Sequence, residues 1–258
     1  RVGIIAGLNV YNGARSLGLH AGETVTEGLD GLRARLLSYA AMGLRFAKWR
    51  GVFALGDGLP SAGSIVANAH ALARYAALCQ ETGLVPIVEP EVLMAGGSTL
   101  AQCGAATARV LHGVFAQLHT QGVMLEAMIL KPNMVLPGLT CPAQETAEAV
   151  AEATIACLLR HVPAAVAGIA FLSGGQSAEL ASARLNAMNL RARPAGSHLP
   201  WPLTFSFGRA LQQPALQVWR GEADNVVAAQ EALLHRARCN RSARRGEYSA
   251  DMERAEAA

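Results

Sequence analysis

Short apolar runs alternate with longer amphipathic segments along most of the chain. Runs of this kind are typical of parallel strands, which are covered on both faces. They lie at residues 2–7, 46–53, 85–92, 127–135, 168–175 and 202–208. The amphipathic segments predict helices at residues 23–42, 61–82, 99–119, 143–160, 177–190 and 225–244.

Polar residues recur at about the same place in each unit, roughly every 40 residues, within or just past an apolar run. They are Lys48, Glu89, Lys131, Ser173 and Arg209. A repeated strand–helix unit predicts an α/β fold, a TIM (β/α)8 barrel, with its chemistry at the carboxyl ends of the strands. Six runs instead of eight predict a barrel that is N-terminally truncated to about six strand–helix units.

Composition narrows the class of protein. The chain has 258 residues, 52% of them hydrophobic, and a net charge of +3. We therefore expect a single, N-terminally incomplete barrel domain over residues 1–258, with a basic C-terminal helix and tail from about 224 to 258. The small net charge argues against a nucleic-acid partner, and the longest uncharged apolar stretch, 162–172, is too short to cross a membrane.

Cysteines and histidines give no metal-ligand spacing. Five scattered cysteines indicate reduced thiols in a cytoplasmic protein, and no metal or other cofactor is expected. Four histidines are expected on the surface: His70, His112, His119 and His161. The arginines of the last helix are expected to form a solvated face; they are Arg236, Arg238, Arg241, Arg244 and Arg245.

Lys131 stands inside an apolar run, where an ammonium is costly unless it is neutral, paired or at a strand end. The chain has 22 basic residues, and only Lys48 and Lys131 are lysines. A neutral amine can attack a carbonyl, which a guanidinium cannot do. Lys131 is therefore either a structural lysine paired with a carboxylate or a Schiff-base lysine kept neutral by burial and by Lys48.

Two neighbouring strands carry charge at alternate positions. Lys48 and Arg50 share one face of the first strand, and Glu89 and Glu91 share one face of the next. A close pair of carboxylates can divide general-acid and general-base roles. The same carboxylates can also simply neutralise the basic residues, and both interpretations can hold together.

A glycine turn, Ser173-Gly174-Gly175, opens one helix, and Gly208-Arg209 closes the next strand. Backbone N–H groups at a helix N-terminus, joined by an arginine, bind phosphate well. The alternative is a tight connection without a ligand.

Longer segments resemble class I fructose-bisphosphate aldolase in sequence. The segments are FAKWR (46–50), VPIVEPEVL (85–93), LKPNMVLPG (130–138), FLSGGQS (171–177) and TFSFGRALQ (204–212). The resemblance runs from about residue 2 to residue 248. It implies a lyase of glycolysis and gluconeogenesis that cleaves fructose 1,6-bisphosphate reversibly to dihydroxyacetone phosphate and glyceraldehyde 3-phosphate, with a protonated imine in place of a metal.

The resemblance also implies roles for four catalytic residues. Lys131 matches the imine-forming lysine, and Glu89 matches the acid–base residue of carbinolamine formation and dehydration. Lys48 and Glu91 match residues that hold the charge balance around them.

A further set of residues resembles the family's substrate-binding positions. Arg50 matches a residue near the distal phosphate. Ser173, Gly174, Gly208 and Arg209 match the clamp on the ketose phosphate.

Three departures from the family pattern support a second hypothesis. The first two barrel strands would precede Arg1, Ile5 falls where a substrate-binding lysine is expected, and the chain ends in Ala258 without a terminal tyrosine. These departures favour a non-catalytic or weakly active aldolase-fold protein that retains a phosphate site. A different Schiff-base lyase fits the motifs less well. A homo-oligomer is possible.

Overall fold

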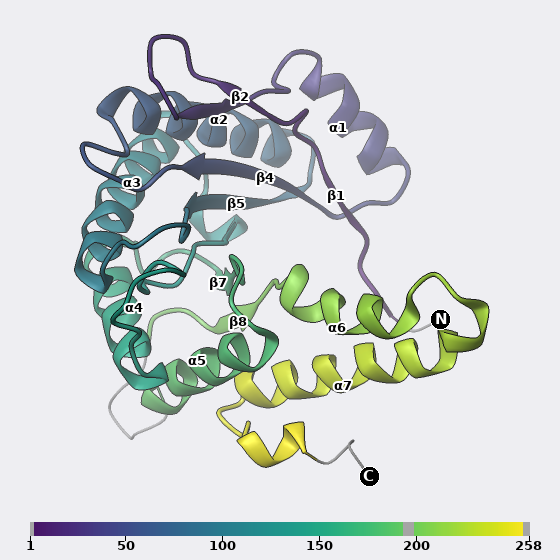
Figure 1. The fold of residues 1–258 in the computed structure, drawn as a ribbon. Coiled ribbons are helices and arrows are strands. Elements are labelled where there is room, and N and C mark those ends of the chain that lie inside the picture. The colour runs from purple at the N-terminus through teal and green to yellow at the C-terminus, as the bar shows by residue number, and fades with distance from the viewer. Residues whose placement is uncertain (1–2, 193–198, 255–258) are drawn as a thin grey trace.

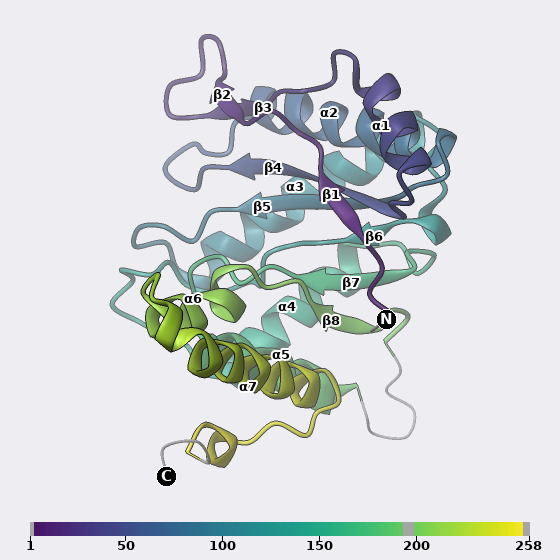
Figure 2. The ribbon, with the colours of Figure 1, turned by 90° about the vertical axis from the view of Figure 1, so that its right-hand side faces the viewer.

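The computed structural model describes residues 3–192 and 199–254. Its centre is a parallel sheet of six strands in the order β1-β4-β5-β6-β7-β8 (Figures 1 and 2). The strands are β1 (Gly7–Asn9), β4 (Phe46–Phe53), β5 (Val85–Val92), β6 (Ile129–Leu130), β7 (Gly168–Phe171) and β8 (Leu203–Phe205). Within the described residues β1 and β8 are not paired with each other, so the sheet is curved but open.

Helices α2 to α5 cover the outer face of the sheet, and α6 and α7 pack beside α5 and β8 (Figure 1). Helix α1 lies against α2. The helices are α1 (Leu32–Ala41), α2 (Ala62–Glu81), α3 (Leu100–Thr120), α4 (Ala147–His161), α5 (Ala178–Arg191), α6 (Arg209–Trp219) and α7 (Val226–Arg244). The α/β class and the repeated strand–helix unit are thus confirmed.

Strand β4 shows why the polar residues gather on one side. Its residues alternate in burial, with Trp49 and Phe53 fully buried on the helix side. Lys48 and Arg50 therefore face the open side of the sheet, because side chains alternate along a strand. The sequence prediction for 46–53 and 85–92 agrees with β4 and β5 at both ends.

Tyr75 on α2 joins the two central strands from behind. Its hydroxyl donates to the carbonyl of Ala47 at 2.6 Å and accepts from the backbone N–H of Ile87 at 3.2 Å. Its ring lies 5.5 Å from the ring of Trp49, centroid to centroid. This buried tyrosine therefore joins α2 to both strands on the side of the sheet opposite to Lys48 and Arg50. We call the side that carries these charged residues the polar face.

The predicted helix at 23–42 is wrong in its first half. Residues Thr24–Thr26 form strand β3, which pairs antiparallel with β2 (Ala14–Ser16). Two of the three β3 residues are threonines and the third is valine, and β-branched residues favour strands. Gly28 and Gly31 have φ of 124° and 66°, and the chain turns there before α1 begins.

Other elements also differ from the prediction; for example, β7 and β8 end at Phe171 and Phe205, before the predicted 175 and 208. The first strand is Gly7–Asn9 instead of 2–7, and Val2 lies outside the described residues. Strand β6 ends after Leu130, because Pro132 has no N–H to donate to a ladder. A 3-10 turn, Leu125–Ala127, takes the place of its expected beginning. Helix α6 was not predicted, and it contains Pro214.

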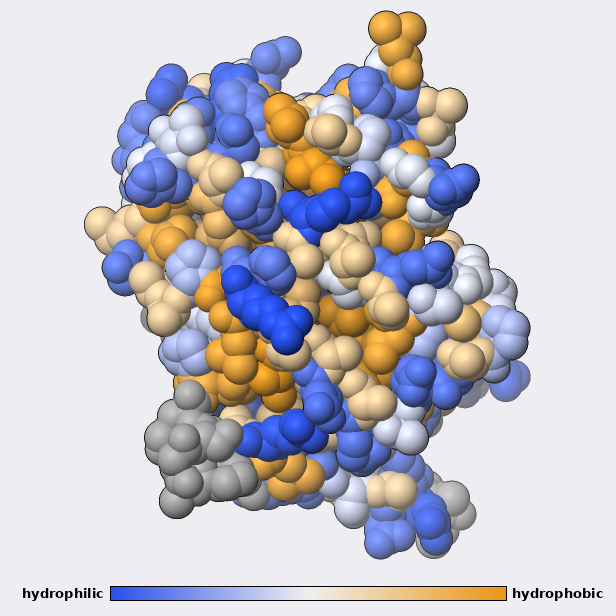
Figure 3. Space-filling model, turned by 90° about the vertical axis from the view of Figure 1, so that its left-hand side faces the viewer, coloured by the Kyte–Doolittle hydropathy of each residue, from blue (hydrophilic) through white to orange (hydrophobic). Residues whose placement is uncertain are grey.

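The outer face of α2, α3 and α4 is mixed in character (Figure 3). Apolar and strongly hydrophilic side chains are interspersed there, and Val66 on α2 and Leu159 on α4 are 60% and 53% exposed. Scattered exposed apolar residues are usual on protein surfaces. The expected homo-oligomer therefore stays a prediction.

Two further predictions concern cysteines and membranes. All five cysteines are free and buried, as expected for reduced thiols. Burial raises the pKa of Cys79 to about 12 and that of Cys157 to about 11. In the described part of the chain, each helix is too short or too polar to cross a bilayer.

We expect Tyr75→Phe to lower the free energy of unfolding by about 1–3 kcal/mol, because the variant removes the buried hydroxyl that donates to the Ala47 carbonyl and accepts from the Ile87 N–H. Urea denaturation followed by circular dichroism measures the change. Tyr39→Phe is the matched control, since the partly buried Tyr39 makes no hydrogen bond through its hydroxyl within the described residues. Equal stability of the two variants would contradict the role given to Tyr75.

Candidate active site

One carboxylate lies between two lysines at the centre of the polar face. The Glu89 oxygens are 3.0 Å (Oε2) from Lys48 Nζ and 3.1 Å (Oε1) from Lys131 Nζ. The side chains of Glu89 and Lys131 are only 5% and 12% exposed. The structure thus brings together the amine, the second cation and the carboxylate that the sequence singled out, and their catalytic roles stay a prediction.

Strand register brings these residues together. Arg50 of β4 is opposite Glu89 of β5, and Val88 is opposite Leu130 of β6. The ladder continues one residue further, because Lys131 N donates to Val88 O at 2.8 Å. Glu89 therefore lies at the level of Lys131, and Lys48 on the other side is opposite Ile87, two residues before Glu89.

The charge balance around Glu89 is uneven. Two ammonium groups share one carboxylate, and Lys48 Nζ also lies 4.8 Å from the centre of the Tyr11 ring, a cation–π contact. Glu89 Oε2 is buried and accepts no hydrogen bond of good geometry within the described residues, so its contact with Lys48 is an ion pair. An oxygen of this kind is suited to accept a proton from a bound substrate.

Arg50 and Glu91 form a second pair on the same face. Arg50 Nε donates to Glu91 Oε2. Burial lowers the pKa of Arg50, but the hydrogen bond and charge of Glu91 outweigh burial and raise it overall. Thr26 Oγ1 donates to the Arg50 carbonyl at 2.6 Å, which connects the β2–β3 hairpin to this position.

The glycine turn follows β7 on the same edge of the sheet. Gly174 and Gly175 have φ of 61° and 108°, a region that favours glycine. Their N–H groups have no protein acceptor within the described residues. The Arg209 guanidinium lies beside the turn, since a Cβ added to Gly175 would be 3.5 Å from Arg209 Nη2.

Arg209 and the turn line one cleft. It has a volume of about 430 Å³ and lies between the N-terminal ends of α5 and α6. Ser173 is buried before it, while Gly208 and Arg209 are exposed. The strand that carries the turn is bonded to the segment after Lys131, because Leu172 N donates to Pro132 O at 3.1 Å. The combination of free N–H groups and a guanidinium is suited to a phosphate.

Ile5, in the segment that precedes β1 (Figure 2), is 66% exposed. Of the histidines expected on the surface, His70, His112 and His119 are exposed and His161 is half-buried.

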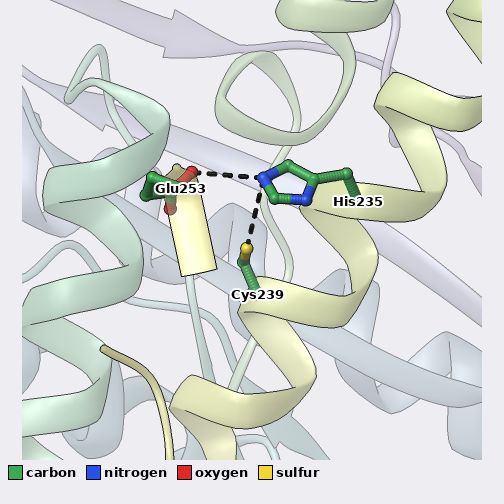
Figure 4. A group of neighbouring side chains, drawn as sticks. All are labelled: His235, Cys239 and Glu253. Carbon is green, nitrogen blue, oxygen red and sulfur yellow. Dashed lines mark hydrogen bonds and ion pairs between the residues drawn. The ribbon is translucent and has the colours of Figure 1, made fainter. Parts of the chain in front are cut away.

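Sequence analysis missed a side-chain cluster between the second half of α7 and the Ala250–Glu253 turn (Figure 4). His235 Nε2 lies 3.3 Å from Glu253 Oε2 and 3.6 Å from Cys239 Sγ. A His and a Cys four residues apart on a helix offer metal ligands on one face. Only the spacing of His235 and Cys239 could have indicated it, because Glu253 belongs to a separate 3-10 turn, Ala250–Glu253.

The contacts of Arg236 favour a structural role for this cluster over a metal site. We call the contacts of Glu253 with His235, Arg236 and Tyr248 the C-terminal latch, because they hold the Ala250–Glu253 turn against α7. The Arg236 guanidinium donates to the same Glu253 oxygen that faces His235. Tyr248 donates to the other Glu253 oxygen at 2.7 Å. The carboxylate thus already carries a cation and two further partners. The expected solvated face is wrong for Arg236, which is 3% exposed, and holds for Arg238, Arg241, Arg244 and Arg245.

Comparisons with known proteins place the whole chain in one group. The family model described as fructose-bisphosphate aldolase class-I matches residues 1–258. A probable fructose-bisphosphate aldolase class 1 from Xanthomonas axonopodis pv. citri is 50% identical over 247 residues, covering 95% of this chain and 72% of that protein. Fructose-bisphosphate aldolase C from Homo sapiens is 49% identical over 251 residues, covering 97% and 68%.

A solved structure agrees in fold. The fructose-bisphosphate aldolase from Plasmodium falciparum, determined in complex with TRAP and a small-molecule inhibitor, superposes with a TM-score of 0.91. It is 45% identical, and the match covers 96% of this chain and 70% of that one.

We expect the C-terminal latch to open as the pH falls below about 4.5, the ordinary pKa of a glutamate. Burial raises the pKa of Glu253, but Arg236, Tyr248 and His235 together lower it overall. A carboxylate with a lowered pKa contributes stability that is present above its unfolded pKa and is lost as the pH falls through its folded pKa. NMR shifts of residues 248–253 measure the transition.

Glu253→Gln should remove this pH dependence, because the amide does not titrate. Asp251→Asn is the control: its carboxylate is 84% exposed and lies 3.7 Å from Arg254. A transition unchanged in the Glu253 variant would show that another group opens the segment.

Proposed function

The chain belongs to the class-I fructose-bisphosphate aldolase family, and we propose that it cleaves fructose 1,6-bisphosphate reversibly through a Schiff base on Lys131. The products are dihydroxyacetone phosphate and glyceraldehyde 3-phosphate. The observation that carries the proposal is the contact of the Lys131 amine with the buried Glu89 carboxylate, on the edge of the sheet that also bears the glycine turn.

Glu89 supplies the proton transfers of imine formation. The Lys131 ammonium gives a proton to Glu89 at 3.1 Å, and the neutral amine adds to the ketose carbonyl to form a carbinolamine. Glu89 returns the proton to the carbinolamine hydroxyl, which leaves as water. The protonated imine then remains on Lys131, and the Glu89 carboxylate keeps its ion pair with Lys48.

The imine is the electron sink for cleavage. A base removes the proton of the C4 hydroxyl, the C3–C4 bond breaks, and its electron pair moves to the imine nitrogen to give an enamine. The aldehyde product leaves, C3 takes up a proton, and water releases the second product from Lys131. The cycle written in this way uses no metal and no other cofactor.

The phosphate groups orient the substrate. Ser173, Gly174, Gly208 and Arg209 hold the ketose phosphate at the turn, and Arg50, held by Glu91, lies toward the distal phosphate. Fixing the ketose phosphate places the carbonyl at Lys131, which is the entropic contribution of binding to the rate. A relative from Pisum sativum is named a cytoplasmic isozyme, and we expect the same location for this protein.

Sodium borohydride should trap dihydroxyacetone phosphate on Lys131, because reduction makes the imine permanent. Peptide mass spectrometry locates the adduct. Lys131→Met should abolish trapping and lower kcat by at least about a thousandfold, since it removes the nucleophile.

Lys131→Arg is the matched variant, because it keeps the positive charge beside Glu89 but cannot form the imine. It should be as inactive as Lys131→Met. Full turnover in either variant, or an adduct on Lys48 instead of Lys131, would contradict the proposed mechanism. Trapping without turnover of fructose 1,6-bisphosphate would indicate a weakly active protein that retains the site.

A further inference from the structure

Arg184 on α5 is a buried cation without a counter-charge in the described ranges. Its residue is 3% exposed, and its one hydrogen bond runs from Nη1 to Gln176 Oε1 at 2.9 Å. Its Nε, like that of Arg236, has no hydrogen-bond partner among the described residues. Burial lowers the pKa of Arg184, but a guanidinium stays protonated in proteins. A buried charge of this kind is costly unless something balances it.

Arg236, the second deeply buried arginine of the described residues, has a carboxylate that balances its charge. Arg236 is also 3% exposed, and its guanidinium contacts the Glu253 carboxylate, the Ala178 carbonyl and the Ser182 hydroxyl. Arg184 has one neutral amide instead. The two arginines are equally buried, but only Arg236 has a carboxylate partner. The fold therefore leaves open what balances the charge of Arg184.

Gln176 connects Arg184 to the glycine turn. Its Oε1 accepts from Arg184, and its Nε2 donates to the Ser173 carbonyl at 2.9 Å. Its backbone N–H donates to the same carbonyl at 3.1 Å. Gln176 also lines the cleft that contains Arg209. Arg184 is therefore connected to the turn through the single side chain of Gln176.

We propose that Arg184 is a positioning residue for phosphate, whose buried charge is balanced by a phosphate dianion bound at the Ser173–Gly175 turn. This inference rests on the proposed function of the site. Arg184, Gln176 and Ser173 are all buried, and charges interact more strongly in a buried environment than in water. The hydrogen bond of Arg184 also fixes Gln176, which holds the turn open for the anion.

The proposal makes the effect of Arg184 specific to ligands that carry phosphate. Borohydride trapping at Lys131 offers a direct comparison, because dihydroxyacetone phosphate and dihydroxyacetone form the same imine and differ only in the charged group. A merely structural role for Arg184 would change the trapping of both ketones alike.

The experiment measures the concentration that gives half-maximal trapping of each ketone, in the full chain. Arg184→Met keeps an unbranched apolar side chain and removes the guanidinium with its charge. It should raise the value for dihydroxyacetone phosphate by about tenfold and leave the value for dihydroxyacetone unchanged. Arg184→Lys should restore most of the difference. Arg191→Met on the same helix is the control, because Arg191 is half exposed and pairs with Glu152 at 3.6 Å.

Binding of inorganic phosphate, followed by NMR, tests the same site without the imine. It should weaken by a similar factor in Arg184→Met. Equal shifts for both ketones, or unchanged phosphate binding, would overturn the inference. Failure of the unmodified protein to trap either ketone would instead refute the proposed function, and phosphate binding would still decide the role of Arg184.

Discussion

The ion pairs of Glu89 with Lys48 and Lys131 are the interaction on which the polar face depends. They join side chains from β4, β5 and the end of β6, so they exist only while three parallel strands keep their register. A shift of one residue in any strand would turn its charged residue toward the helices. Tyr75 secures that register from behind, because its hydroxyl bonds both β4 and β5. The hydrophobic side of the sheet thus determines the geometry of its chemical side.

Several features of this arrangement were predictable from sequence because they are local. Strands β4 and β5 are long apolar runs in which charged residues alternate on one face, and both their bounds and the direction of Lys48, Arg50, Glu89 and Glu91 followed from period two. The glycine turn and Arg209 also carried their own signal. The distances within the ion-pair cluster did not follow, because they depend on pairing between strands about 40 residues apart.

The failures share a physical cause, which is competition from distant contacts or from proline. The helix expected over 23–42 lost its first half to a hairpin that gains hydrogen bonds from Ala14–Ser16. Helix α6 contains Pro214. Because proline usually ends a helix, its presence in the sequence argues against a helix at these residues. Arg236 looked like one member of an exposed basic run, but a carboxylate 17 residues further along draws it into the interior. Helical periodicity alone contains no information about that partner.

Pro132 has a consequence for how the amine of Lys131 reaches a carbonyl. A residue before proline is confined to extended backbone conformations. The Lys131 N–H is also bonded to Val88 O, so its Cα has little freedom. The flexible part of this residue is then the four-carbon side chain alone, which works as a tether of fixed origin and limited length. The length of this side chain therefore limits which carbonyl can react. A ketone bound within reach of Nζ can form the imine, and one bound slightly outside that distance cannot, however tightly it binds.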